Sequence, residues 1–171
     1  MSDVSKAESA AWECRLQERL PLFGHRNWIV VADAAYPSPA NPGIETLVTG
    51  ADQIVAVRTV SHAIGACSHV LADIYTDLEI SFIAESDAPG IAAYRHQLDD
   101  LFPASTRKQL PHEEIIARLD RSARLFHILI LKTTMRLPYT SVFFELDCGY
   151  WNTEAEVRLR HAIQYSEVRG E

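Results

Sequence analysis

A short β-branched run, Ile29 to Val31, lies between Gly24 and a loop with three prolines. A continuous apolar run with turn residues on both sides is typical of a strand that is covered on both faces. Such a strand is expected near the centre of its sheet. In α/β folds, ligands bind where the chain leaves the carboxyl ends of the central strands. Here Asp33 occupies that exit.

The remaining hydrophobic pattern predicts further elements. Short apolar or alternating runs predict strands at 54–57, 78–83, 126–131 and 142–146, the last one ended by Gly149. Apolar residues that recur every three or four positions predict helices at 62–74, 89–101 and 112–123. Capping boxes mark two terminal helices, with Ser5 to Glu8 in the helix at 3–20 and Thr153 to Glu156 in the helix at 153–166. The proline-containing residues 34–43 are predicted to form a stiff, exposed loop.

Strands that alternate with helices predict an α/β fold, with a central sheet that is mostly parallel or mixed and with helices on both of its faces. At 171 residues and 47% apolar composition, the chain can bury one substantial core. We therefore expect a single domain over residues 1–171, with the two terminal helices as peripheral elements.

Composition argues against several classes of partner. The formal net charge is -7 and no segment is rich in lysine or arginine, so neither nucleic acid nor an anionic membrane is an expected partner. No apolar segment approaches the roughly 20 residues of a membrane-spanning helix, and the amino end has no signal-peptide core. We expect a cytoplasmic protein. The cysteines, at positions 14, 67 and 148, are widely spaced and are expected to be buried free thiols.

Several motifs that would indicate a cofactor or a nucleophile do not occur in the sequence. Neither of the Gly-rich phosphate-loop patterns is present, so a nucleotide cofactor is not expected, and no Gly-x-Ser-x-Gly motif supports a nucleophilic serine. His62 and His69 would share one face of the predicted helix, but no third ligand stands at metal-binding spacing. We expect neither a metal nor an organic cofactor.

The polar residues that remain stand where predicted elements begin or end: His25, Asp33, His112, Tyr139 and Ser141. Taken singly, each has an ordinary structural interpretation. Such residues often lie on the surface, form turns, cap helices or pack against neighbours. Their order along the chain is the more specific observation.

In that order, these residues match a known family. From about residue 20 to 149 the chain resembles the D-ribose pyranase and L-fucose mutarotase (RbsD/FucU) proteins, through Gly24-His25, Ala32-Asp33-Ala34, Leu110 to Glu114 and Pro138-Tyr139-x-Ser141. The resemblance implies an RbsD-like three-layer fold and a cofactor-independent sugar isomerase. It also implies that His25 is the proton donor and that Asp33, His112, Tyr139 and Ser141 bind the sugar. A monosaccharide such as fucose or ribose and a ring-like homo-oligomer are the implied partners.

The chain departs from the family pattern in three places. Ser141 stands where the family has asparagine, Thr134-Met135 where it usually has Gly-Glu, and Ile115-Ile116 where Phe-Lys is common. These departures keep open a second hypothesis, a sugar-binding or regulatory module that retains the pocket without turnover. A purely structural assembly subunit is a third hypothesis, but it leaves the ordered polar motifs unexplained.

The chemistry of ring opening and closure needs only a general acid and a general base. Histidine suits both roles because its unperturbed pKa is about 6.5. Distance adds a constraint, since residues 25 and 33 of a fully extended chain would stand roughly 26–29 Å apart. A monosaccharide cannot bridge that distance. We therefore expect either that the Gly24-His25 segment folds back or that His25 reaches the site of a second subunit.

Overall fold

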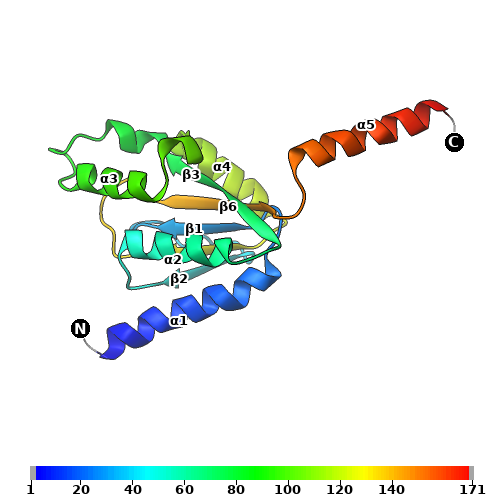
Figure 1. Cartoon of the computed structure of the whole chain (residues 1–171). Helices are drawn as coiled ribbons and strands as arrows, with labels where there is room; N and C mark the ends of the chain where they lie inside the picture. Colours follow the sequence, from blue (N-terminus) through cyan, green and yellow to red (C-terminus); the bar gives the residue numbers. More distant parts are fainter. Residues whose placement is uncertain (1–2, 170–171) are drawn as a thin grey trace.

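A computed structural model of the chain describes the backbone of residues 3–169 and the side chains of residues 11–165. A six-stranded sheet with the order β2-β5-β1-β6-β3-β4 forms its centre (Figure 1). The strands are β1 (Trp28–Ala32), β2 (Ile44–Val48), β3 (Val70–Asp77), β4 (Lys108–Leu110), β5 (Ile128–Lys132) and β6 (Val142–Cys148). Because β6 pairs antiparallel with β1 and β3 while the other pairs are parallel, the sheet is mixed.

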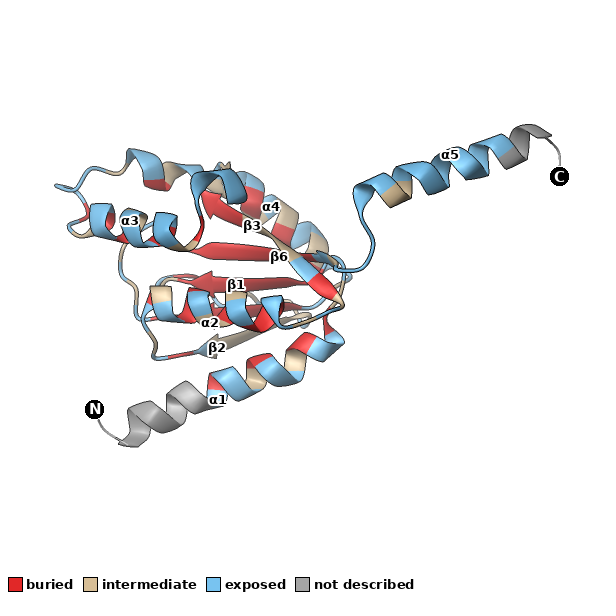
Figure 2. Ribbon diagram, in the orientation of Figure 1, coloured by how far each residue is buried: buried red, intermediate tan, exposed pale blue. Residues whose placement is uncertain are grey.

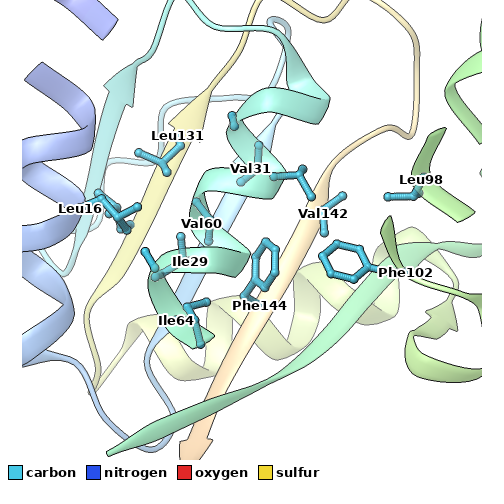
Figure 3. Close-up of a cluster of buried hydrophobic side chains, with 14 of the residues drawn as sticks. Leu16, Ile29, Val31, Val60, Ile64, Leu98, Phe102, Leu131, Val142 and Phe144 are labelled. Carbon is cyan, nitrogen blue, oxygen red and sulfur yellow. The ribbon is translucent and has the colours of Figure 1, made fainter. Parts of the chain in front are cut away.

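Helices cover both faces of this sheet, which confirms the predicted α/β class. They are α1 (Asp3–Arg19), α2 (Gln53–Gly65), α3 (Ile91–Leu101), α4 (His112–Ala123) and α5 (Thr153–Arg169). The alternation of side chains along β1 produces two cores, because neighbouring residues point to opposite faces. Ile29 and Val31 pack in the core under α1, α2 and α3 (Figure 3), whereas Trp28 and Val30 pack in the core under α4.

β1 is the central, doubly covered strand that its β-branched run predicts. All of its residues are buried, and it lies third in the strand order (Figure 2). The loop at 34–43 contains neither helix nor strand, as predicted. The helices predicted at 89–101 and 112–123 and the strands predicted at 126–131 and 142–146 are present as α3, α4, β5 and β6, with ends shifted by up to two residues.

The strand predicted at 54–57 is wrong, because these residues lie in the first turns of α2. Asp52 decides this outcome. Its carboxylate accepts hydrogen bonds from the backbone N–H groups of Ile54 and Val55, at 2.9 and 3.4 Å, and so caps the helix. Within this apolar run, Ala56 and Val57 lie on the buried side of the helix, whereas Val55 is exposed.

Other boundaries also differ from the predictions. The helix predicted at 62–74 is wrong in its second half, since α2 ends at Gly65 and β3 begins at Val70. His69 therefore does not share a helix with His62. The strand predicted at 78–83 is wrong, because Leu78–Phe82 forms a 3-10 helix. β2 and β4 were not predicted. β4 has only three residues, which are too few to show an alternating pattern in the sequence.

The terminal helices differ in how they contact the body of the molecule. α1 contributes Trp12 and Leu16 to the core, whereas α5 projects away from the sheet (Figure 1). The Asn152 carboxamide, rather than Thr153, caps α5 by accepting the Ala155 N–H at 2.8 Å. The side chains of the predicted capping box Ser5 to Glu8 lie outside the described residues. Within the described part of the chain, no helix is long and apolar enough to cross a membrane.

The cysteines are free thiols, but their predicted burial is only partly correct. Cys14 is exposed, because α1 turns only one side toward the core. Cys67 and Cys148 are half-buried.

Gln53, the first residue of α2, ties together the ends of three strands. Its fully buried amide donates from Nε2 to the carbonyl oxygens of Val31 in β1, at 3.0 Å, and Thr140 before β6, at 2.8 Å. Its Oε1 accepts a hydrogen bond from the hydroxyl of Thr133, which follows β5. One side chain therefore holds the edge of the sheet from which Asp33 and Ser141 emerge.

We predict that Gln53→Ala lowers the free energy of unfolding by about 2–4 kcal/mol, because buried carbonyl and hydroxyl groups lose their partners. Urea denaturation measures the change. Gln109→Ala is the matched control, since the Gln109 amide bonds the side chain of the exposed Ser81, and it should cost below about 0.5 kcal/mol. Equal effects of the two substitutions would contradict a structural role for Gln53.

Candidate functional site

The topology of the sheet gathers polar residues at one of its edges. β1, β3, β4 and β5 run in the same direction, so their carboxyl ends meet there. Asp33 follows β1, Asp77 ends β3, and His112 comes two residues after β4. β6 runs in the opposite direction and starts at this edge, just after Ser141. This is the position where α/β folds bind ligands.

A pocket of about 510 Å³ opens at this edge. Its volume is in the range of sites that hold small molecules. The sheet-edge residues in its lining are Asp33, Asp77, His112, Tyr139 and Ser141. Other parts of its wall come from the proline loop and from α4: Ala35, Tyr36, Pro37, Pro39, Glu113, Ile116, Leu119 and Asp120, with Pro138 beside Tyr139. Four of the five residues named from the sequence therefore meet in one pocket.

Asp33 and Ser141 form one polar pair in the pocket lining. The Ser141 hydroxyl donates to Asp33 Oδ2 at 3.2 Å, and Asp33 Oδ1 accepts the Ala35 N–H at 2.8 Å. The second bond is the usual way in which an aspartate closes a turn. Asp33 is half-buried, so its carboxylate is held in place and still reaches the pocket.

His112 and Tyr139 form the second polar pair. Their rings meet edge to face, with centroids 5.6 Å apart and an interplanar angle of 84°. Tyr139 has a φ of 57°, in the left-handed region that a tyrosine seldom occupies, and such backbone positions cluster at functional sites. The backbone N–H of His112 also donates to both carboxylate oxygens of Glu79, at 3.0 and 3.1 Å. Backbone and ring contacts together orient the imidazole.

Asp77 is the partner of His112 inside the pocket, and sequence reasoning missed it. Asp77 Oδ1 lies 3.0 Å from His112 Nδ1. The residue is fully buried, and among the described residues Oδ2 has no hydrogen-bond partner. Burial raises the pKa of the Asp77 carboxyl to about 6, against the hydrogen bond and charge of His112, which lower it. An acid at the end of a strand, like Asp33, was the available signal, but the wrong boundaries at 62–74 and 78–83 left Asp77 between elements.

The pocket is acidic, and burial together with that charge raises the pKa of its other tyrosine. Tyr36 is 6% exposed in the pocket wall. Burial, followed by the charges of Asp120, Asp77 and Asp33, raises the pKa of its phenol. The phenol therefore remains a neutral hydrogen-bonding group at any physiological pH.

His25, the fifth residue named from the sequence, lies at the opposite edge of the sheet. It precedes β1, and its Nδ1 is 2.6 Å from Oδ1 of Asp147, near the far end of β6. Arg26 Nε donates to His25 Nε2 at 3.0 Å, which places the ring proton on Nδ1. The hydrogen bond from the Cys148 N–H, and then the one from His25, lowers the pKa of Asp147. Of the two alternatives left open by the sequence, the fold-back of the Gly24-His25 segment does not occur.

This opposite edge has a hollow of its own, with a volume of about 620 Å³. Besides His25 and Asp147, its lining includes Tyr150 and Trp151, which lead into α5. Among the described residues, no group of three His, Cys, Asp or Glu side chains is arranged to hold a metal ion at either edge.

Comparison with solved structures identifies proteins of the same fold. The chain is similar to Bacillus subtilis RbsD complexed with D-ribose, with a TM-score of 0.54 and 19% identity over 78% of this chain and 91% of that one. It is also similar to the fucose mutarotase from Streptococcus pneumoniae in complex with L-fucose, with a TM-score of 0.51, 19% identity and the same coverage. FucU from Bifidobacterium longum gives a TM-score of 0.52 and 12% identity over 78% of this chain and 94% of that one.

These similarities confirm the predicted resemblance at the level of the fold. No protein-family model matches the sequence, and comparison with curated proteins finds no significant match. The roles of individual residues therefore rest on the geometry of the pocket.

The raised pKa of Asp77 predicts a specific dependence of stability on pH. Because the folded-state pKa of about 6 lies above the usual value of 3.8, ionisation of Asp77 destabilises the fold. This cost is absent below about pH 4 and complete above about pH 7. The unfolding free energy of Asp77→Asn, minus that of the parent, should therefore rise with pH between these limits, by up to about 3 kcal/mol.

Denaturation of both proteins across this pH range measures the difference. Asp120→Asn, which removes an exposed carboxylate from the same pocket, is the matched control for loss of an acid. A difference that falls as the pH rises would contradict the prediction and would indicate that ionised Asp77 stabilises the fold through a charged His112.

Proposed function

We propose that the protein is a sugar isomerase that interconverts the ring and anomeric forms of a monosaccharide without a cofactor. The observation that carries this proposal is the convergence of Asp33, His112, Tyr139 and Ser141 on one pocket that is large enough for a monosaccharide. A carboxylate, an imidazole, a phenol and a hydroxyl supply the donors and acceptors that fix the rim of a sugar. The fold shared with proteins whose structures hold D-ribose and L-fucose supports it.

The reaction consists of proton transfers and one reversible bond cleavage. A base removes the proton of the anomeric hydroxyl while an acid protonates the ring oxygen, and the bond between the anomeric carbon and the ring oxygen breaks. The open aldehyde then rotates, or recloses through another hydroxyl, and the protons return in the reverse order. Atoms and electrons balance, and groups that titrate near neutral pH suit both half-reactions.

His25 is the proposed acid and base, and a second copy of the chain supplies it. From Trp28 to Asp33, β1 alone spans about 17 Å, so His25 cannot reach the pocket of its own chain. In a second copy, the hydrogen bond from Nδ1 to Asp147 leaves Nε2 as the basic atom, once Arg26 releases it. Asp147 acts as the positioning residue for this imidazole.

Two residues with unusual backbone conformations support the proposal that both ends of the sheet are functional. Among the described non-glycine residues, φ is positive at Arg26, with 74°, and at Tyr139, with 57°. One lies beside His25 and the other lies in the pocket. If each chain offers its His25 end to the pocket end of the next, the contact is heterologous, and a suitable rotation closes such contacts into a ring. The proposed active assembly is therefore a ring-like homo-oligomer.

We predict that the protein accelerates exchange between the ring forms of at least one monosaccharide. Saturation-transfer NMR at equilibrium measures this rate for a panel of neutral and amino-substituted pentoses, hexoses and deoxyhexoses. His25→Ala should reduce the acceleration at least about 100-fold, because general acid–base groups contribute on that scale. His96→Ala, which removes an exposed histidine of α3, is the matched control and should leave the rate unchanged.

The alternatives predict other results in the same samples. A sugar-binding module without turnover would titrate a sugar in a calorimeter, leave its exchange rate unchanged and lose only affinity in His25→Ala. A structural assembly subunit would bind no sugar. Folded protein that accelerates the exchange of no sugar on the panel sinks the isomerase proposal.

A composite site, formed by the His25 end of one chain and the pocket of another, predicts complementation between impaired subunits. His25→Ala and Tyr139→Phe chains, each weak alone, should regain activity when they are mixed and reassembled, because some interfaces then unite the intact His25 with the intact pocket. Dilution should remove activity before the fold is lost, since assembly follows mass action. Full activity at a light-scattering mass of one 19.2 kDa chain would refute the composite site.

A further inference from the structure

The pocket wall carries an excess of negative charge. Its lining includes four carboxylates, Asp33, Asp77, Glu113 and Asp120, and neither lysine nor arginine is among its described lining residues. His112 is the one basic group in that lining. A phosphate or carboxylate group would meet four groups of like charge here and, among the described lining residues, no basic group other than His112.

Of these carboxylates, only Asp77 lies within ion-pair distance of a basic side chain among the described residues, with His112 Nδ1 at 3.0 Å. Elsewhere on the same elements, acids are matched: Glu114 pairs with Arg118 at 2.8 Å and Asp73 pairs with Lys108 at 2.7 Å. Within the described side chains, Glu113 and Asp120 form no ion pair. The charge of the pocket therefore faces the space where a ligand binds.

Asp77 gives an independent indication that a ligand donor is missing. It is 0% exposed and lines the pocket, yet Oδ2 has no hydrogen-bond partner among the described residues. A buried carboxylate oxygen without a donor is costly and uncommon. A ligand that donates a hydrogen bond at this point would satisfy it.

We propose that the sugar bound in this pocket is an amino sugar, held in its ammonium form against the acidic wall. The inference rests on the proposed use of the pocket by a sugar and narrows the class of that sugar. An ammonium group offers three donors and one positive charge, so it satisfies Asp77 Oδ2 and offsets the charge of the surrounding acids. Sugar phosphates and uronic acids are excluded by the same charge.

Positive groups near the wall do not remove this preference. Arg136 lines an adjoining hollow of about 360 Å³, which shares Asp33, Ala35 and Pro138 with the pocket. In the proposed assembly, a second copy brings His25 and Arg26 toward the pocket. Both contributions are the same for every sugar tested, so a comparison of matched sugars isolates the effect of the amine.

NMR titration tests the proposal with matched pairs at a pH where the amine is protonated. The pairs are D-glucosamine with D-glucose and D-galactosamine with D-galactose, with N-acetyl-D-glucosamine, D-glucuronate and a ribose phosphate as uncharged and anionic comparisons. At least one amine should bind about tenfold or more tightly than its neutral partner, and added salt should reduce the ratio. The anions should not bind.

Variants identify the source of the preference. Asp120→Asn and Glu113→Gln should each lower the ratio of amine to neutral affinity at least about threefold. Glu114→Gln, next to Glu113 but paired with Arg118 and outside the pocket, is the matched control and should leave the ratio unchanged. Amines that bind no more tightly than neutral sugars would overturn the inference.

The affinity ratio tests the amino-sugar inference, and the exchange rate tests the isomerase proposal, so either can be contradicted without the other. If neutral sugars exchange rapidly and amines have no advantage, the proposed function stands and the amino-sugar inference falls. If amines bind preferentially but the exchange of no sugar is accelerated, the inference stands and the isomerase proposal falls.

Discussion

The antiparallel insertion of β6 between β1 and β3 is the constraint on which the pocket depends. In the backbone pairing, Val142 stands opposite Val31 on one side and Thr76 on the other. One residue earlier, the same register places Ser141 opposite Ala32, which precedes Asp33, and opposite Asp77, which ends β3. A slip by a single residue would turn each side chain to the other face of the sheet. The hydroxyl and the carboxylates would then no longer share a pocket.

This arrangement concentrates groups that oppose stability. Asp77 is buried with an unsatisfied oxygen, and Tyr139 holds a left-handed backbone conformation. Such features persist only where the surrounding structure determines them strongly. Here the support comes from the doubly packed β1 and from the buried amide of Gln53, which ties the same edge of the sheet to α2. The rigid scaffold and the strained site are therefore adjacent, as function in a preorganised pocket requires.

Local sequence was informative where local forces decide the structure. The β-branched run of β1, the amphipathic pattern of α4 and the glycine that follows β6 each predicted an element, because periodicity and turn chemistry act over a few residues. It failed at 54–57, where an apolar run suits a strand or a buried helix equally well. The Asp52 cap resolved that ambiguity. β4, with three residues, exists through its pairing with β3, and a single sequence contains no local trace of such pairing.

The candidate site shows the same division between what the local sequence predicts and what only the fold decides. By itself, the sequence determined which polar residues follow or precede the strands and, through the order of its motifs, the fold they resemble. Only the tertiary structure decided which of them meet. Strand direction brings Asp33, His112, Tyr139 and Ser141 together, adds the buried Asp77, and leaves His25 with Asp147 at the other edge. The physical reason is that the pairing of β1 with β5 and β6 joins residues 100 or more positions apart, and neither propensity nor spacing along the chain specifies that pairing.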